Sequence, residues 1–324
     1  MKRFSLLAVV LMLLASLAVS QDAIPVGAQR AHFARVYNPN APAVPPASTM
    51  TYYGGPIMSG TANNIYIVYY GNWTSGDKRI INSWATNIGA SPLYNANTTF
   101  YDNASPNNFI QPVVGFNFVT HTCNDLYSLG KHLNDANIQT IVANAISSGC
   151  LPNDVNGIYF VLTYVDVMES AFGGAFCTLF CGYHTFSNTI VAGEDIKYSF
   201  VGNPAKCPSG CDGNVAVYGD KTSPNQDVGA DGAVSIMFHE LSESVTDPLV
   251  TSTAYSAWGA GTCGENGDCC NFTFGPTSTG TNSKGTYHYN QTIGGRRYLL
   301  QEMFALSQGP PNFTNVPGTC VQSH

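Results

Sequence analysis

Residues 237–248 combine residue types and a spacing that could do chemistry. They read Met-Phe-His-Glu-Leu-Ser-Glu-Ser-Val-Thr-Asp-Pro. On a helix, His239 and Glu243 are i, i+4 neighbours, the separation at which two side chains can hold one metal ion, and Glu240 lies beside them. The apolar residues fall on one stripe of such a helix and the ionisable residues fall on the other side. The segment therefore predicts a helix with a metal-binding face.

The chemistry expected of this face is metal-assisted hydrolysis. The motif is the zinc-hydrolase pattern His-Glu-x-x-His with glutamate in place of the second histidine, and carboxylates bind zinc at about 2.0–2.2 Å. Zn2+ would lower the pKa of a bound water, while Glu240 would carry the proton as catalytic base. A third protein ligand is required beside His239 and Glu243, and Glu265 is the first candidate because neighbouring cysteines could hold it rigidly. The alternative ligands are Asp247, Asp268 and His184.

A second interpretation of the same residues stays open. His239, Glu240 and Glu243 could form a solvated helix face, with Glu243 bonded to a neighbouring loop. Only 10% of the residues in the chain are charged, so the gathering of ionisable side chains on one helix face favours a metal site. Serine-hydrolase chemistry has no starting point, since the pattern Gly-x-Ser-x-Gly is absent.

The N-terminus has the pattern of a cleavable signal peptide over residues 1–20. A basic start precedes an apolar run from residue 6 to residue 17, and small residues follow at 18–20. The run is shorter than the roughly 20 residues of a transmembrane helix, so no membrane span is expected. The chain is therefore predicted to be secreted, with a mature form that begins near Gln21.

Ten cysteines, all beyond residue 120, agree with export. An even number in a secreted chain predicts disulfides rather than zinc binding by thiolates. Close spacing predicts small loops closed by Cys177–Cys181 and by Cys207–Cys211. A bond between Cys123 and Cys150 is expected to brace a helical segment, and the last four cysteines, Cys263, Cys269, Cys270 and Cys320, are expected to hold the C-terminal region. Six Asn-x-Ser/Thr glycosylation motifs, expected on the surface, lie at Asn72, Asn97, Asn103, Asn271, Asn290 and Asn312.

Composition limits the partners. The formal net charge is −7 and becomes −9 once Lys2 and Arg3 leave with the signal peptide. No basic patch or basic helix is present in the sequence, which excludes nucleic acid and anionic membranes as expected partners. Hydrophobic residues make up 44% of the chain, as in a globular protein.

Local patterns predict an α+β fold. Strands are expected at 64–70, 113–120, 157–166, 189–192 and 198–201, and helices at 75–88, 134–146 and about 231–246, the last capped by Asp231. This order implies a mixed β-sheet with packed helices and an irregular, disulfide-rich C-terminal region. Residues 21–50 are predicted to be a Pro-rich leader or short propeptide, and residues 51–324 a single domain.

Several segments, taken in order, resemble the EXORDIUM / phosphate-induced protein 1 family. They are Tyr53-Gly54-Gly55-Pro56, Tyr69–Trp73, Cys177, Cys181–His184, Val201–Asn203, Cys207-Pro208 to Cys211, Asp227–Gly232, His239–Glu243, Asp247–Leu249, Glu265–Cys270 and Gly295–Gln301. The family consists of secreted, cell-wall-associated proteins best known from plants. The resemblance implies a location in the extracellular space (the apoplast), a link to growth control, and cell-wall or extracellular-matrix components as partners.

The segment around His239 also resembles the active helix of zincin-type metallopeptidases. That resemblance implies a zincin-like architecture, a Zn2+ cofactor and a peptide substrate. The cysteines Cys123, Cys150, Cys263 and Cys269, and Glu302 in place of an aromatic residue, depart from the first family and mark a divergent member. Two functions follow as expectations: a zinc-dependent peptidase, or a non-catalytic extracellular signalling or wall-binding protein on a degenerate zincin scaffold.

Overall fold

The computed structural model describes residues 31–40, 48–250, 255–260 and 262–324. The predicted signal peptide lies outside the described residues. Among them, no helix is long and apolar enough to cross a lipid bilayer.

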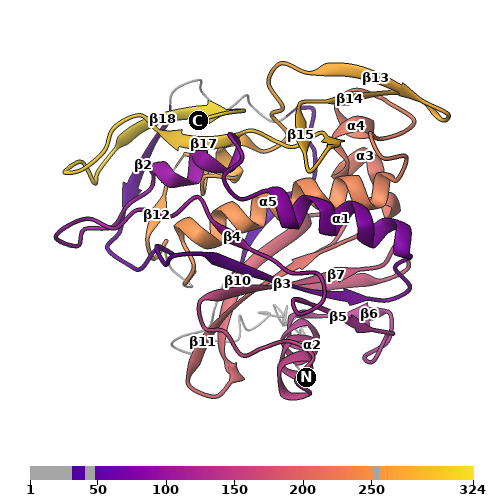
Figure 1. Cartoon of the computed structure of the whole chain (residues 1–324), viewed down its shortest axis with the longest axis horizontal. Helices are drawn as coiled ribbons and strands as arrows, with labels where there is room; N and C mark the ends of the chain where they lie inside the picture. Colours follow the sequence, from indigo (N-terminus) through magenta and orange to yellow (C-terminus); the bar gives the residue numbers. More distant parts are fainter. Residues whose placement is uncertain (1–30, 41–47, 251–254, 261) are drawn as a thin grey trace, which may run out of the picture.

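A mixed β-sheet forms the middle layer of the molecule (Figure 1). The helices α1 (Ser75–Asn87) and α5 (Val228–Thr246) lie side by side on one face of this sheet, and α2 (Asp135–Ser147) covers the other face. Smaller sheets and hairpins surround the helix layer, mostly from the C-terminal third of the chain. The predicted α+β class, with helices packed on a mixed sheet, is confirmed.

The main sheet has the strand order β1–β10–β11–β7–β3–β4, with β5 also paired to β3. The strands β11, β7, β3, β4 and β5 run parallel, whereas β10 and the edge strand β1 are antiparallel to their neighbours. The central strands are apolar runs buried on both faces, as expected for parallel strands covered by helices. The bounds are β1 His32–Arg35, β3 Asn63–Tyr70, β4 Val114–Gly115, β5 Thr122–Asp125, β7 Gly157–Thr163, β10 Phe180–Val191 and β11 Glu194–Val201.

The three long helices begin at side-chain caps. Thr74 and Asp77 form a capping box at α1, and Asn134 and Asn137 form one at α2. The predicted cap of α5 is wrong, because Asp227 caps this helix by accepting a bond from the Ala230 amide. The shorter helices are η1 Tyr94–Thr99, η2 Pro204–Lys206, α3 Pro208–Cys211, α4 Gly213–Ala216 and η3 Asp268–Cys270.

Two strand predictions differ from the structure. The predicted strand at 113–120 is wrong beyond β4, since Phe118 and Val119 are exposed in a turn instead of buried in the sheet. The predicted strand at 189–192 is the end of the much longer β10. The remaining strands are β2 Ser48–Tyr52, β6 His132–Leu133, β8 Met168–Ala171, β9 Gly174–Ala175, β12 Trp258–Gly259, β13 Ser278–Asn282, β14 Gly285–Tyr289, β15 Gln291–Ile293, β16 Arg296–Tyr298, β17 Met303–Leu306 and β18 Val316–Val321.

All ten cysteines form disulfides, but two predicted pairings are wrong. Short loops were expected from close spacing, whereas the bonds join Cys177 to Cys207 and Cys181 to Cys211 and so connect the start of β10 to the turn that contains α3. The bond between Cys123 and Cys150 is as predicted. The last four cysteines pair within the C-terminal region, as Cys263–Cys269 and Cys270–Cys320.

The glycosylation motifs differ in exposure. Asn72, Asn103 and Asn312 are exposed, and Asn271 and Asn290 are half-buried. The surface expectation is wrong for Asn97, which is 0% exposed. Its Nδ2 donates to Ser242 Oγ at 3.1 Å and its Oδ1 accepts from Asn266 Nδ2 at 2.9 Å, so the amide nitrogen that would carry a glycan is already used inside the core.

We expect no glycan on Asn97 in the secreted protein, because a glycan there could not leave the packed interior. The exposed motifs at Asn72, Asn103 and Asn312 are accessible and serve as internal controls. Mass spectrometry of glycopeptides, before and after enzymatic deglycosylation, measures the occupancy of each motif. A folded, secreted chain with substantial glycan on Asn97 would contradict the burial described above.

A buried carboxyl group lies under the face of the sheet that α2 covers. Glu169, in β8, is 0% exposed, and its Oε1 accepts a bond from the Tyr183 hydroxyl at 3.3 Å. Burial, and after it the negative charge of Asp135, raise the pKa of Glu169 to about 8. The folded chain therefore keeps a proton that the unfolded chain releases near its ordinary value of 4.5.

The substitution Glu169→Gln should make stability less dependent on pH. Between about pH 4.5 and 8 only the folded chain holds this proton. As the pH rises through this range, the free energy of unfolding of the wild type therefore falls relative to that of the variant, by about 1 kcal/mol per pH unit. Denaturant unfolding at pH 5 and at pH 7.5 measures the effect as a difference between the two proteins. Asp195→Asn, at an exposed site, should show the same change in stability between the two pH values as the wild type. An equal change for the wild type and Glu169→Gln would contradict the prediction.

Candidate metal centre

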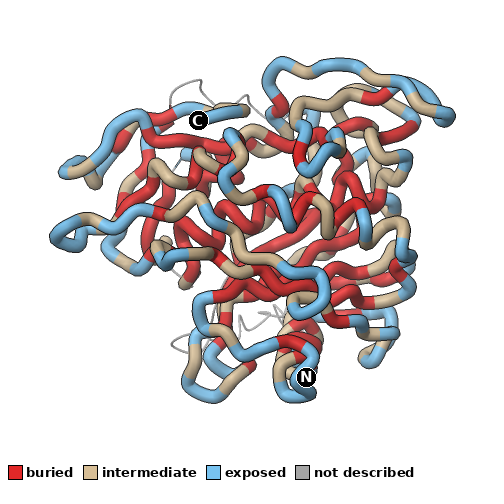
Figure 2. The backbone as a smooth tube through the Cα atoms, in the orientation of Figure 1, coloured by how far each residue is buried: buried red, intermediate tan, exposed pale blue. Residues whose placement is uncertain are grey.

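The helix α5 is buried along almost its entire length (Figure 2). His239 is 1% exposed, and Glu240 and Glu243 are 0% exposed. The expectation of a solvated helix face is therefore wrong. The strands β1 and β10 of the main sheet face Glu240, and the segment from Cys263 to Cys270 faces His239 and Glu243.

Side chains from three further parts of the fold meet α5 at this point. His32 comes from β1, His184 from β10, and Glu265 and Asp268 from the disulfide-bonded segment before and within η3. Together they form a histidine–carboxylate cluster, which consists of His32, His184, His239, Glu240, Glu243, Glu265 and Asp268.

Glu243 lies at the centre of the cluster. Its Oε1 is 2.9 Å from His239 Nε2 and accepts a bond from the Asp268 amide at 2.9 Å, while its Oε2 is 3.5 Å from His184 Nε2. Two sets of three side chains have ligand atoms within 4.8 Å of one another, and both contain Glu243. They are His239, Glu243 and Asp268, and His184, Glu240 and Glu243.

The structure brings together two of the three ligands expected from the sequence. His239 and Glu243 are adjacent, and Asp268, an alternative ligand, completes their set. Glu265 lies in the cluster but on another side of it. Its Oε2 is 2.8 Å from His32 Nδ1 and 2.9 Å from His184 Nε2, so it holds two histidines.

Asp247, the remaining alternative ligand, is hydrogen-bonded to the loop that follows α5. Its carboxylate accepts bonds from the backbone amides of Ser256 and Ala257 and from the Ser256 hydroxyl. Burial, and after it the charge of Glu265, raise the pKa of Asp247 to about 7. Asp247 therefore fixes the loop that follows α5 and belongs to neither set of ligand atoms.

Residues that sequence reasoning missed orient the ligands. Gln301 Oε1 lies 3.1 Å from His239 Nδ1, and Gln301 Nε2 donates to the Gly267 carbonyl at 3.0 Å. This arrangement has Nδ1 donating its proton to the amide oxygen, so that Nε2 is the ring nitrogen that faces Glu243. Gln301 lies in a segment already recognised by its resemblance. His32 had a weaker signal, an aromatic and apolar stretch in front of the Pro-rich run.

The pair of His32 and Glu265 is strongly ionic. Burial opposes the charged form of His32, but the Glu265 carboxylate outweighs it and raises the pKa of His32 to about 10. Burial likewise opposes ionisation of Glu265, yet the charges of His32 and His184 lower its pKa to about 2. This side of the cluster is therefore a neutralised ion pair that needs no further cation.

The side around His239 differs. Burial opposes a charge on His239, but Glu243 raises its pKa to about 10. Burial, and after it the charge of Glu243, raise the pKa of Asp268 to about 7, and burial raises that of Glu240 well above its ordinary value. On this side of the cluster, bound protons neutralise the carboxylate groups. A metal ion would compete with these protons for the same ligand atoms.

The donor set fits a divalent cation. Among the described residues, several buried polar atoms of the cluster have no hydrogen-bond partner, which is rare in a native interior. These atoms are His184 Nδ1, Glu240 Oε2, Glu243 Oε2 and Glu265 Oε1, while His239 Nε2 has only its ion-pair contact with Glu243 Oε1. The four carboxylates of the cluster also outnumber its three imidazoles. Nitrogen and carboxylate oxygen are ligands that Zn2+ accepts, so the residues present fit a zinc ion at Glu243.

Two glycines allow the cluster to close. A Cβ at Gly267 would lie 2.8 Å from Glu243 Oε1, and one at Gly182 in β10 would lie 3.1 Å from Glu240 Oε1. Both positions need the space of a missing side chain, because the carboxylates beside them are buried and cannot move into solvent.

The substitution Gly267→Ala should destabilise the fold by about 1–3 kcal/mol, the usual range for overpacking. Gly309→Ala is the matched control, because a Cβ there meets nothing within 4 Å, and it should change stability by less than about 0.5 kcal/mol. Denaturant unfolding of both variants measures the difference. Equal stabilities of Gly267→Ala and Gly309→Ala would show that the segment carrying Asp268 is not closely packed against Glu243.

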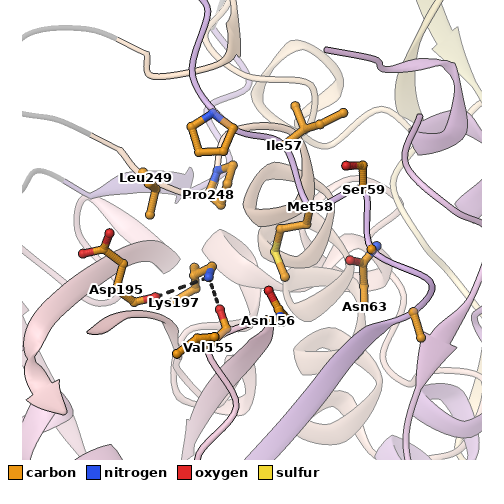
Figure 3. A pocket seen from close by; sticks show the side chains of 13 residues that line it. Ile57, Met58, Ser59, Asn63, Val155, Asn156, Asp195, Lys197, Pro248 and Leu249 are labelled. Carbon is orange, nitrogen blue, oxygen red and sulfur yellow. Dashed lines mark hydrogen bonds between the residues drawn. The ribbon is translucent and has the colours of Figure 1, made fainter. Parts of the chain in front are cut away.

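A separate pocket of about 450 Å³ lies near the end of α5 (Figure 3). Its walls include Met58, Pro248 and Leu249, and Lys197 lies beside it and donates to the carbonyls of Val155 and Asp195. None of the cluster residues lines this pocket. The ammonium group of Lys197 is already bonded, so we assign no chemistry to the pocket.

Comparison with known proteins supports the resemblance seen in the sequence. The model of the "Phosphate-induced protein 1 conserved region" matches residues 50–309. Protein EXORDIUM-like 5 of Arabidopsis thaliana is 31% identical over 280 residues, which cover 78% of this chain and 74% of the relative. Protein EXORDIUM-like 3 of the same plant is 31% identical over 289 residues, 79% of this chain and 80% of the relative. Protein PHOSPHATE-INDUCED 1 of Nicotiana tabacum is 23% identical over 225 residues, 63% and 67% of the two chains. No solved structure matches the chain significantly.

Proposed function

Since the chain belongs to the EXORDIUM / phosphate-induced protein 1 family, we propose that it is a secreted extracellular protein of growth control whose histidine–carboxylate cluster binds Zn2+ and hydrolyses peptide bonds. The observation that carries the proposal is the convergence of buried ligand atoms around Glu243, several of which have no hydrogen-bond partner. Five disulfides support an extracellular location. The packing of α5 on the sheet beside β10 supports a zincin-like arrangement.

The proposed zinc ligands are His239, Glu243 and Asp268. They form one of the two sets of ligand atoms, the set that contains neither Glu240 nor His184, which is already paired with Glu265. Asp268 replaces Glu265 as the third ligand, because Glu265 is already paired with His32 and His184. Bound zinc would supply Lewis acidity and a more acidic water.

Glu240 is the proposed catalytic base. It follows His239 directly, and its Oε2 has no partner among the described residues. Its Oε1 accepts the Ala34 amide at 3.1 Å, which fixes the carboxylate in one orientation. His184 and Glu265, held together at 2.9 Å, form the opposite wall and exclude bulk water from this side.

A second candidate function is that of a non-catalytic wall-binding or signalling protein. One observation favours it: Glu240 is fully buried and bonded to the backbone of the chain's own β1, so no substrate reaches it in this arrangement. In that case the cluster, with or without a metal, would serve stability.

Metal analysis of variants distinguishes the ligand sets. Glu243→Gln should lower zinc affinity about 10-fold or more, because Glu243 belongs to both sets. His239→Ala and Asp268→Asn should have the same effect, whereas His184→Ala should keep the metal. Elemental analysis and competition with a chromogenic chelator measure the affinity, and circular dichroism checks the fold. Loss of zinc in His184→Ala alone would move the site to the second set.

Glu240→Gln separates binding from catalysis. The variant should retain zinc and lose peptide hydrolysis, measured with a library of quenched fluorescent peptides. If the wild type binds no zinc even when it is supplied to chelator-treated protein, the second candidate function holds instead.

A further inference from the structure

The strand β1 reaches the cluster from outside the part of the chain that matches the family. The family model begins at residue 50, whereas β1 spans His32–Arg35. The sequence of residues 38–46, which separates the two, is Asn-Pro-Asn-Ala-Pro-Ala-Val-Pro-Pro. The first cysteine of the chain is Cys123, so no disulfide ties β1 to the domain. Non-covalent contacts alone hold it in place.

These contacts involve the backbone of β1 and the side chain of His32, whose Nδ1 lies 2.8 Å from Glu265 Oε2. The strand pairs antiparallel with β10 at the edge of the main sheet. Beyond this pairing, the Ala34 amide donates to Glu240 Oε1, and the Tyr37 amide donates to the Gly210 carbonyl at 2.7 Å. Recognition of this kind, by addition of a strand to a sheet edge, suits an extended peptide of almost any sequence.

Two side-chain positions add selectivity. Phe33 stacks on Phe180 with ring centroids 5.1 Å apart, on the face of the sheet away from α5. Ala34 is 4% exposed and pairs with Gly182, and a Cβ on Gly182 itself would lie 2.7 Å from Ile236 Cγ2, so α5 packs closely against this part of the sheet. Together with His32, these positions mean that the site takes a histidine, then an aromatic residue, then a small one.

We infer that residues 31–37 occupy in cis a groove whose ligand is an extended peptide with a histidine, an aromatic residue and a small residue in succession. The incoming peptide would pair with β10 in place of β1 and present its backbone to Glu240. Because β1 belongs to the same chain as the groove, its effective concentration there is about millimolar, so β1 keeps the groove closed to weaker competitors. The inference rests on the proposed function for the role of Glu240, whereas the exchange of strands needs no metal.

A binding experiment tests the exchange. Ala34→Pro removes the amide that donates to Glu240 and weakens β1 without altering the family domain. A fluorescent peptide with the sequence of residues 31–38, Ala-His-Phe-Ala-Arg-Val-Tyr-Asn, is titrated into the full chain in the presence of a chelator. The variant should bind this peptide at least about 10-fold more tightly than the wild type does. Arg35→Ala, which alters an exposed side chain, should resemble the wild type.

A second experiment avoids any effect of the substitution on folding. Residues 41–47 are replaced by the recognition sequence of a specific endopeptidase, and the full chain is folded first and cut afterwards. Native mass spectrometry should find the N-terminal piece still bound after the cut and released when the fluorescent peptide is added in excess. A peptide with Phe and Ala exchanged should release it less effectively.

The outcomes separate this inference from the proposed function. Peptide exchange in chelator, in a protein that binds no zinc, would support the groove and remove the hydrolase. If the protein binds zinc but the peptide binds neither to Ala34→Pro nor to the cut chain, the inferred groove is wrong and the proposed function is unaffected.

Discussion

The burial of ionisable groups between α5 and β10 is the constraint on which the rest of the structure depends. A carboxylate taken out of water without a partner costs several kcal/mol, so every carboxylate there must meet an imidazole, an amide or a cation. Glu265 meets two histidines, Glu243 meets the Asp268 amide and His239, and Glu240 meets the Ala34 amide. The disulfide-bonded segment and the edge strand thus both supply partners for the same buried charges, although they are far apart in sequence.

The helix of the site could be predicted, but its surroundings could not. The i, i+4 relation between His239 and Glu243 is local and follows from helical periodicity alone. The arrival of His184 and His32 depends on β10 and β1, whose pairing joins residues about 150 positions apart. Glu265 and Asp268 lie within one short segment, and their order of preference depends on how the loop turns and not on spacing.

Local patterns also failed where burial decides. Asp227 and Asp231 are four residues apart, about one helical turn, so both suit the start of α5 and only the packed structure selects the first. The apolar run at 113–120 has the composition of a strand, yet Phe118 is 61% exposed. A glycosylation motif such as that of Asn97 contains no information on whether its asparagine faces water.

The two disulfides that join β10 to the α3 turn have a consequence for the cell that makes the protein. Each native bond closes a loop with a sequence separation of 30, and the two bonds lie side by side. The competing bonds, Cys177–Cys181 and Cys207–Cys211, would close loops of four residues and cost far less chain entropy. Oxidation of a nascent chain therefore favours the wrong pairs until β10 has docked. Thiol–disulfide exchange is the reaction that would convert such pairs to the native connectivity once β10 has docked.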